Sequence, residues 1–82
     1  MASDAGFMPL RFNNPVKLRR QMSQRGWTEV QILEAMQTKP ISVPGKLGPA
    51  LRYVHPVTGK SVVVDAMTGE IFHVGGEGFR YG

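Results

Sequence analysis

The chain has no cysteine among its 82 residues. Without thiols it can form neither a disulfide framework nor a thiolate metal site, and this fits a protein that works in a reducing compartment. A chain of this length is near the lower limit at which a hydrophobic core can stabilise a fold without disulfides or a bound metal. We therefore expect one domain.

Long apolar runs are also lacking. The longest is the short run at Val62–Val64, whereas a membrane-spanning helix needs about 20 apolar residues. The start of the chain does not show the charged and then apolar pattern of a signal peptide. We expect a soluble domain without membrane contact, in which residues 1–13 form a flexible leader and residues 14–82 form the domain.

Acidic and histidine side chains are few. The sequence has six Asp and Glu residues and two histidines, His55 and His73. Neither group shows the spacing of metal ligands, and two-metal nuclease chemistry needs several converging carboxylates. We therefore expect no metal and no other cofactor.

Positive charge, by contrast, is concentrated at one end of the chain. Residues 1–25 contain Arg11, Lys17, Arg19, Arg20 and Arg25 but only one acidic residue, Asp4, which accounts for the whole net charge of +4. A charge excess confined to one element indicates an anionic partner such as a nucleic acid. A solvated basic helix face is the simpler interpretation, and it stays open here.

A first helix is predicted over residues 15–25. Asn14 can cap its start, Pro15 suits its first position, and Gly26 can end it. The cations of the basic segment therefore fall largely on one helix.

A second helix is predicted over residues 29–37. Thr28 and Gln31 have the spacing of a capping box, and Trp27 with Ile32 fits a hydrophobic staple. Lys39-Pro40 closes this helix.

The second half of the chain changes to strand patterns. Strands are predicted at residues 41–43, 50–55, 61–66 and 70–74. Thr68-Gly69 is a hairpin turn between the last two. Two N-terminal helices packed on a three- to four-stranded antiparallel sheet make an α+β fold.

The chemistry that this composition permits is cationic. RNA carries its own nucleophile, the 2′-hydroxyl, so it can be cleaved by transphosphorylation if protein groups deprotonate that hydroxyl and neutralise the phosphorane. A lysine can act as the base when nearby cations and burial favour its neutral form. Lys17, which has Arg19, Arg20 and Arg25 on the same predicted helix, offers this arrangement and is the candidate base.

The spacing of Lys17 and Arg25 limits how they can act on one RNA. Lys17 and Arg25 are eight residues apart, which is about 12 Å of helix rise. They fit the two ends of a scissile dinucleotide better than a single phosphate. That both are simply solvated is the alternative.

Two blocks of the sequence resemble a known family. Leu18–Glu29, which includes Arg25-Gly26-Trp27-Thr28-Glu29 and is followed by Ile32, is similar to the helix-turn-helix of the colicin E-five type tRNA ribonuclease domain. Gly59–Ile71, with its Val62–Val64 run and Thr68-Gly69-Glu70 turn, resembles the central hairpin of the same family. The resemblance covers about residues 16–74.

This resemblance implies a barnase-, EndoU- and RelE-like fold and an activity. The family cleaves tRNA within the anticodon loop and leaves a 2′,3′-cyclic phosphate, without metal or catalytic histidine. Its catalytic lysine matches Lys17 and its catalytic arginine matches Arg25. A further active-site lysine has its nearest counterpart in Lys46, in a loop that is shorter here.

The resemblance also implies partners. We expect a tRNA substrate, an acidic immunity protein or antitoxin that occupies the RNA site, and a monomeric toxin. Its place of action would be the cytoplasm of a target cell, which it could reach as the C-terminal part of a larger secreted toxin.

Two regions differ from the family. The specificity loop between Ile41 and Pro49 is largely missing, and the family's longer tail is replaced by a short one that ends in Gly82. The family's preferred tRNAs therefore do not carry over. In this tail Phe79 and Tyr81 could stack on unpaired bases while Arg80 binds a phosphate; a hydrophobic end folded on the sheet is the alternative.

Further candidate nucleic-acid contacts complete the expected interface. They are Arg19, Arg20, Arg52, Lys60 and His73. A strand histidine is more often structural, and a cation at a strand end is usually solvated. Two other functions stay open: a catalytically silent RNA-binding module, and a protein-interaction module whose basic helix docks on an acidic partner.

Overall fold

The computed structural model describes residues 10–45 and 48–76. In this part of the chain two helices, α1 (Pro15–Arg25) and α2 (Glu29–Ala35), precede four strands. The strands are β1 (Ile41–Gly45), β2 (Gly48–Val54), β3 (Ser61–Asp65) and β4 (Ile71–Val74). They form one antiparallel sheet in the order β1-β2-β3-β4. The structure therefore confirms the α+β fold.

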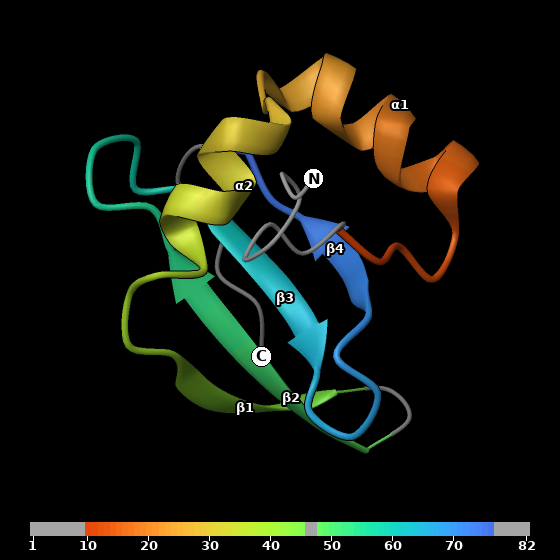
Figure 1. Ribbon diagram of the computed structural model, residues 1–82, viewed down its shortest axis with the longest axis vertical. Coiled ribbons are helices and arrows are strands. Elements are labelled where there is room, and N and C mark those ends of the chain that lie inside the picture. The colour runs from red at the N-terminus through yellow and green to blue at the C-terminus, as the bar shows by residue number, and fades with distance from the viewer. Residues whose placement is uncertain (1–9, 46–47, 77–82) are drawn as a thin grey trace, which may run out of the picture.

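Both helices pack on the sheet through its second half. Helix α1 contacts β4 and α2 contacts β3, so the helices sit over the strands that come last in the chain (Figure 1). The two helices have 11 and 7 residues, and among the described helices none is long and apolar enough to cross a membrane.

The ends of α1 have the expected caps. The Asn14 side chain accepts a hydrogen bond from the Lys17 N–H, and Pro15 occupies the first helical position. Gly26 adopts the left-handed conformation with φ 72° and its N–H donates to the Met22 carbonyl. A side chain at this φ would be strained, so glycine is needed where the helix ends.

Helix α2 starts as predicted and ends two residues earlier. Both bonds of the capping box between Thr28 and Gln31 are present. The helix stops at Ala35, whose carbonyl accepts from the Thr38 hydroxyl at 2.7 Å. A hydroxyl that satisfies a last-turn carbonyl is a local alternative to continuing the helix.

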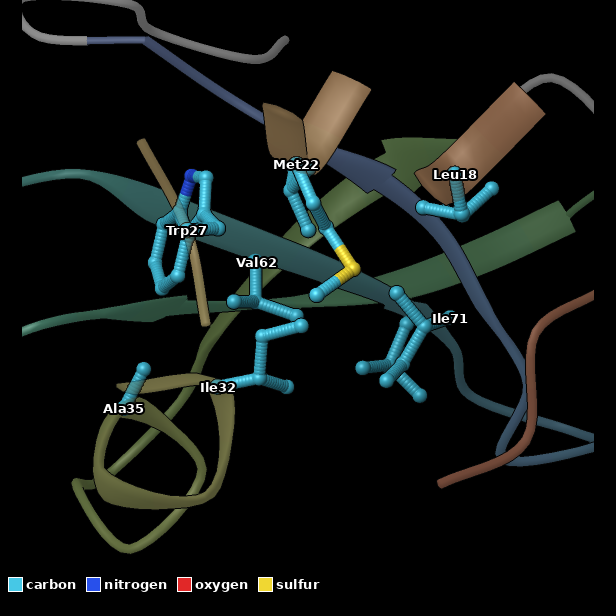
Figure 2. Close-up of a cluster of buried hydrophobic side chains, with 9 residues drawn as sticks. Leu18, Met22, Trp27, Ile32, Ala35, Val62 and Ile71 are labelled. Carbon is cyan, nitrogen blue, oxygen red and sulfur yellow. The ribbon is translucent and has the colours of Figure 1, made fainter. Parts of the chain in front are cut away.

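The hydrophobic core lies between the helices and the sheet (Figure 2). Its buried members are Leu18, Met22, Trp27, Ile32, Ala35, Val62, Val64, Ile71 and Val74. The indole N–H of Trp27 has a hydrogen-bond partner, because Nε1–H donates to the Gly75 carbonyl at 2.7 Å. A buried indole N–H without such a partner would be costly.

A bulge interrupts the pairing of β3 with β4. Val63 pairs with His73 and Val64 pairs with Ile71, so Phe72 is the extra residue on β4. The bulge lets Ile71 and Val74 both reach the core although they are three residues apart.

The segment before α1 corrects the expected domain boundary. Residues 10–13, which the sequence assigned to the leader, belong to the fold: Ile71 donates its N–H to the Arg11 carbonyl at 2.7 Å and accepts from the Asn13 N–H at 3.0 Å. Phe12 and Leu10 pack against the core. The outer edge of β4 has backbone groups that need partners, and this segment supplies them. Residues 1–9 lie outside the described residues.

Ile32 gives a test of this core. The Ile32 side chain is fully buried, whereas Val30 on the same helix is 63% exposed. We expect Ile32→Ala to lower the free energy of unfolding by about 2–5 kcal/mol, because it leaves a cavity. The matched control Val30→Ala should change it by less than about 0.5 kcal/mol. Urea denaturation measures both, and equal effects would contradict this packing.

Candidate functional site

Helix α1 is attached to the edge strand β4 by two side chains that hold one residue. Gln21 Oε1 accepts the Val74 N–H at 3.2 Å, and the Arg25 guanidinium donates to the Val74 carbonyl at 2.8 Å. Lys17, Gln21 and Arg25 are spaced four residues apart, so they form one row along the helix. The row places Lys17 at the opposite end of the helix from Arg25.

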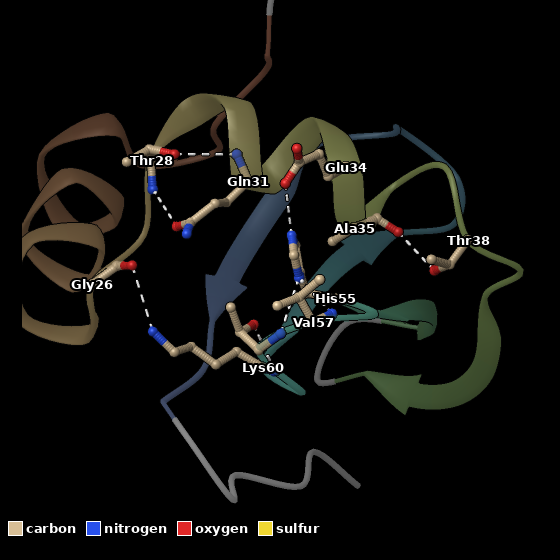
Figure 3. A network of polar contacts seen from close by, with 10 residues as sticks. Gly26, Thr28, Gln31, Glu34, Ala35, Thr38, His55, Val57 and Lys60 are labelled. Atoms are coloured by element: carbon tan, nitrogen blue, oxygen red, sulfur yellow. Dashed lines mark hydrogen bonds and ion pairs between the residues drawn. The ribbon is translucent and has the colours of Figure 1, made fainter.

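The C-terminal end of α1 is also held by a lysine. Lys60 Nζ donates to the Arg25 carbonyl at 2.7 Å. It also lies 3.5 Å from the Gly26 carbonyl (Figure 3). It is also 6.0 Å from the centroid of the Trp27 ring. A cation at the last carbonyls of a helix compensates their partial negative charge. Lys60 therefore serves as a cap of α1.

Lys17 lies at a pocket of about 410 Å³ beside the first turn of α1. The pocket brings together the start of that helix, the ends of β1 and β2, and the turn between β3 and β4. Its lining consists of Asn13, Lys17, Gly45, Gly48, Pro49, Asp65, Thr68, Glu70 and Phe72. The volume is in the range of small-molecule sites.

The two carboxylates of the pocket, Asp65 and Glu70, differ in their hydrogen bonding. Asp65 Oδ1 accepts the Met67 and Thr68 N–H groups at 2.8 and 3.1 Å, so it holds the β3–β4 turn. The half-buried Glu70 carboxylate has no hydrogen bond or ion pair with any described residue, and the same is true of the exposed Lys17 ammonium. Among the charged pocket side chains, Lys17 and Glu70 are therefore the ones that make no hydrogen bond or ion pair with a described residue.

The face of the sheet opposite the helices carries two more candidates. Arg52, Val63 and His73 are paired across β2, β3 and β4, and they alternate with the core residues of those strands. Arg52 Nε donates to the Ser61 hydroxyl at 2.8 Å. Arg52 and His73 thus belong to a surface separate from the row on α1.

The predicted site residues therefore fall into separate groups. Lys17 lines the pocket, whereas Arg25 and Lys60 lie at the other end of α1, and the structure does not bring Lys17 and Arg25 together. Arg19 and Arg20 are exposed on α1. The remaining candidates, Lys46, Phe79, Arg80 and Tyr81, lie outside the described residues.

His55 is a structural residue. Its Nδ1 accepts the Val57 and Thr58 N–H groups, so the proton is on Nε2, which donates to Glu34 at 2.8 Å (Figure 3). The buried imidazole joins α2 to the turn after β2. Among residues 10–45 and 48–76, no three His, Asp or Glu side chains are grouped to hold a metal ion.

Sequence reasoning missed the acidic side of the pocket. Thr68-Gly69-Glu70 indicated a hairpin turn, and Glu70 was not singled out. The available signal was a carboxylate directly after a tight turn. Only the fold shows that Glu70 and Lys17 line the same pocket.

Comparisons with protein-family models, with curated proteins and with solved structures found no significant match to this chain. The resemblance to the colicin E-five type ribonucleases thus stays a prediction from the two sequence blocks. The site has to be interpreted from its own residues.

Arg25 and Lys17 should differ in their effect on stability. We expect Arg25→Ala to lower the free energy of unfolding by about 1–3 kcal/mol, because the Val74 carbonyl loses a charged donor. Lys17→Ala should change it by less than about 0.5 kcal/mol, because the side chain is exposed. Urea denaturation with the wild type as reference decides this. Equal stability of the Arg25 variant and the wild type would show that the bond to Val74 contributes nothing.

Proposed function

We propose that this chain is a metal-independent endoribonuclease that cleaves tRNA by attack of a 2′-hydroxyl on the adjacent phosphate. The observation that carries the proposal is the position of Lys17. Its ammonium, which pairs with no described residue, lines a pocket of about 410 Å³ on the helix where the charge excess of the chain is concentrated.

The charges of α1 suit a polyanion. The helix contains four cations and no acidic residue, and Arg19 and Arg20 make no ion pair with any described residue. Exposed arginines of this kind bind phosphates with two parallel hydrogen bonds. RNA bound along α1 would therefore have its backbone beside the pocket.

Lys17 supplies the electrostatic part of the reaction. When the 2′-oxygen attacks phosphorus, negative charge grows on the phosphorane, and a nearby ammonium stabilises that charge. The products are a 2′,3′-cyclic phosphate and a 5′-hydroxyl. No metal is required for this reaction, because the nucleophile belongs to the substrate.

Arg25 fits a second position on the RNA. Its bond to the Val74 carbonyl uses one of the five N–H groups of a guanidinium, and it fixes the side chain at the far end of α1. About 12 Å of helix rise separates it from Lys17, so it would bind one end of a dinucleotide while Lys17 binds the other.

Preference for tRNA and inhibition by an acidic protein rest on the sequence resemblance alone. The cations of α1 would suit an acidic protein inhibitor that imitates RNA as well as they suit RNA itself. Both features are parts of the proposal and need their own measurements.

An RNA-binding module without cleavage is the second candidate. The observation that favours it is the structural use of Arg25 and Lys60, which reduces the number of cations left for chemistry. Such a module would bind RNA with the same helix and leave it intact.

Cleavage should be visible without metal. We expect total tRNA incubated with the protein in EDTA to give discrete fragments ending in a 2′,3′-cyclic phosphate. Lys17→Ala should lower the rate by about 10²–10⁴-fold, and Arg25→Lys tests the second position while keeping a charged donor to Val74. The matched control is Lys39→Ala, because Lys39 is an exposed lysine that does not line the pocket.

Intact tRNA at high protein concentration would overturn the ribonuclease proposal. If the same sample binds tRNA, the RNA-binding module is the remaining candidate. Fragments that the Lys17→Ala variant produces at the wild-type rate would show that the pocket is not the reaction site.

Binding should depend on salt through the arginines of α1. We expect Arg19→Ala and Arg20→Ala each to weaken tRNA binding and to reduce the slope of log K against log salt by about 0.7–0.9 for each phosphate that the variant no longer binds. Lys39→Ala should leave the slope unchanged. Fluorescence anisotropy between low and moderate salt measures it, and unchanged slopes in both arginine variants would exclude α1 as the RNA-binding element.

A further inference from the structure

We infer that Glu70 is the general base of the pocket, and that Lys17 acts as the protonated partner of the phosphate and of the leaving 5′-oxygen. This inference rests on the proposed ribonuclease function. It changes the assignment made from sequence, in which Lys17 was the base.

The first argument is the exposure of Lys17. The base role expected from sequence needs a lysine whose neutral form is favoured by burial, whereas the Lys17 side chain is exposed to solvent. A lysine ammonium offers three N–H donors, and among the charged side chains of the pocket the carboxylates are the acceptors. In this pocket the lysine can donate a proton, and the acceptor has to be a carboxylate.

The second argument separates Glu70 from the other carboxylate. Asp65 Oδ1 is engaged by two backbone N–H groups of the turn, so its position is fixed by structure. The Glu70 carboxylate makes no hydrogen bond with any described residue. Its backbone is nevertheless anchored, because the Glu70 N–H donates to the Thr68 hydroxyl at 3.2 Å and the Glu70 carbonyl accepts from the Asp65 N–H at 2.9 Å.

The third argument is the arrangement of the pocket walls. Lys17 comes from α1 and Glu70 from the β3–β4 turn, and both line the same space of about 410 Å³. Gly45 at the end of β1 and Gly48 and Pro49 at the start of β2 also line it. The two groups therefore flank a space large enough for a ribose and its phosphate.

The reaction step balances with these two residues. The Glu70 carboxylate takes the proton of the 2′-hydroxyl, and the 2′-oxygen forms a bond to phosphorus. The bond from phosphorus to the 5′-oxygen breaks, and that oxygen takes a proton from the Lys17 ammonium. The protein is left with a neutral carboxylic acid and a neutral amine, which exchange protons with water to restore the starting state.

The test uses the full chain and two matched substrates. One is an oligonucleotide with a single ribonucleotide at the bond that the wild type cleaves in tRNA. The other has sulfur in place of the bridging 5′-oxygen at that bond, so its leaving group needs no proton. Single-turnover cleavage is measured for Glu70→Gln, Glu70→Asp and Lys17→Ala, with Glu29→Gln as the control because Glu29 is exposed on α2 and does not line the pocket.

We expect Glu70→Gln to cleave both substrates about 10²–10⁴-fold more slowly than the wild type, while Glu70→Asp keeps part of the activity. Lys17→Ala should be nearly inactive on the oxygen substrate and recover much of its activity on the sulfur substrate. Circular dichroism and RNA-binding measurements on each variant distinguish removal of the base from unfolding or from weaker RNA binding.

Three outcomes would overturn the inference. Full cleavage by Glu70→Gln removes Glu70 from the reaction, and recovery of Glu70→Gln on the sulfur substrate makes it the acid. In both cases the ribonuclease function stands. A wild type that cleaves neither substrate nor tRNA overturns the proposed function, and this inference falls with it.

Discussion

The attachment of α1 to β4 is the contact on which the rest of the molecule depends. An edge strand leaves backbone groups without partners, and here Gln21 and Arg25 engage both backbone groups of Val74. The segment before the helix does the same for Ile71. With that edge covered, α1 is held over β4 (Figure 1). Lys17 in its first turn then lines the same pocket as residues of the β3–β4 turn.

This attachment divides the basic residues of the chain into two kinds. Arg25 and Lys60 donate to backbone carbonyls at the end of α1 and hold the fold together. Lys17, Arg19 and Arg20 make no ion pair with described residues and remain available to an anion. The net charge of +4 therefore counts cations that are used within the fold together with cations that are exposed. The position of each cation relative to backbone carbonyls separates the two kinds.

The fold was predictable where its signals are local. The caps at Asn14 and Gly26, the capping box at Thr28 and the β-branched run in β3 each act within a few residues, and the helices and strands they predict are present. The hydrogen bonds of Arg25 and Gln21 to Val74 join residues that are 49 and 53 positions apart in the sequence. No local sequence pattern can therefore predict them. The pairing of residues 11 and 13 with Ile71 joins parts of the chain that are far apart in sequence. The same is true of the pocket that Lys17 and Glu70 both line. For that reason the cationic half of the candidate site was found from sequence and the acidic half was not.

The bulge in β4 allows this strand to serve both the hydrophobic core and the pocket. In a regular strand, side chains alternate strictly between the two faces of the sheet. Two residues that are three positions apart then point to opposite faces. Phe72 is the extra residue of the bulge, and it lines the pocket while Ile71 and Val74 belong to the core. The bulge therefore lets one short strand contribute a residue to the pocket between two core residues that are three positions apart.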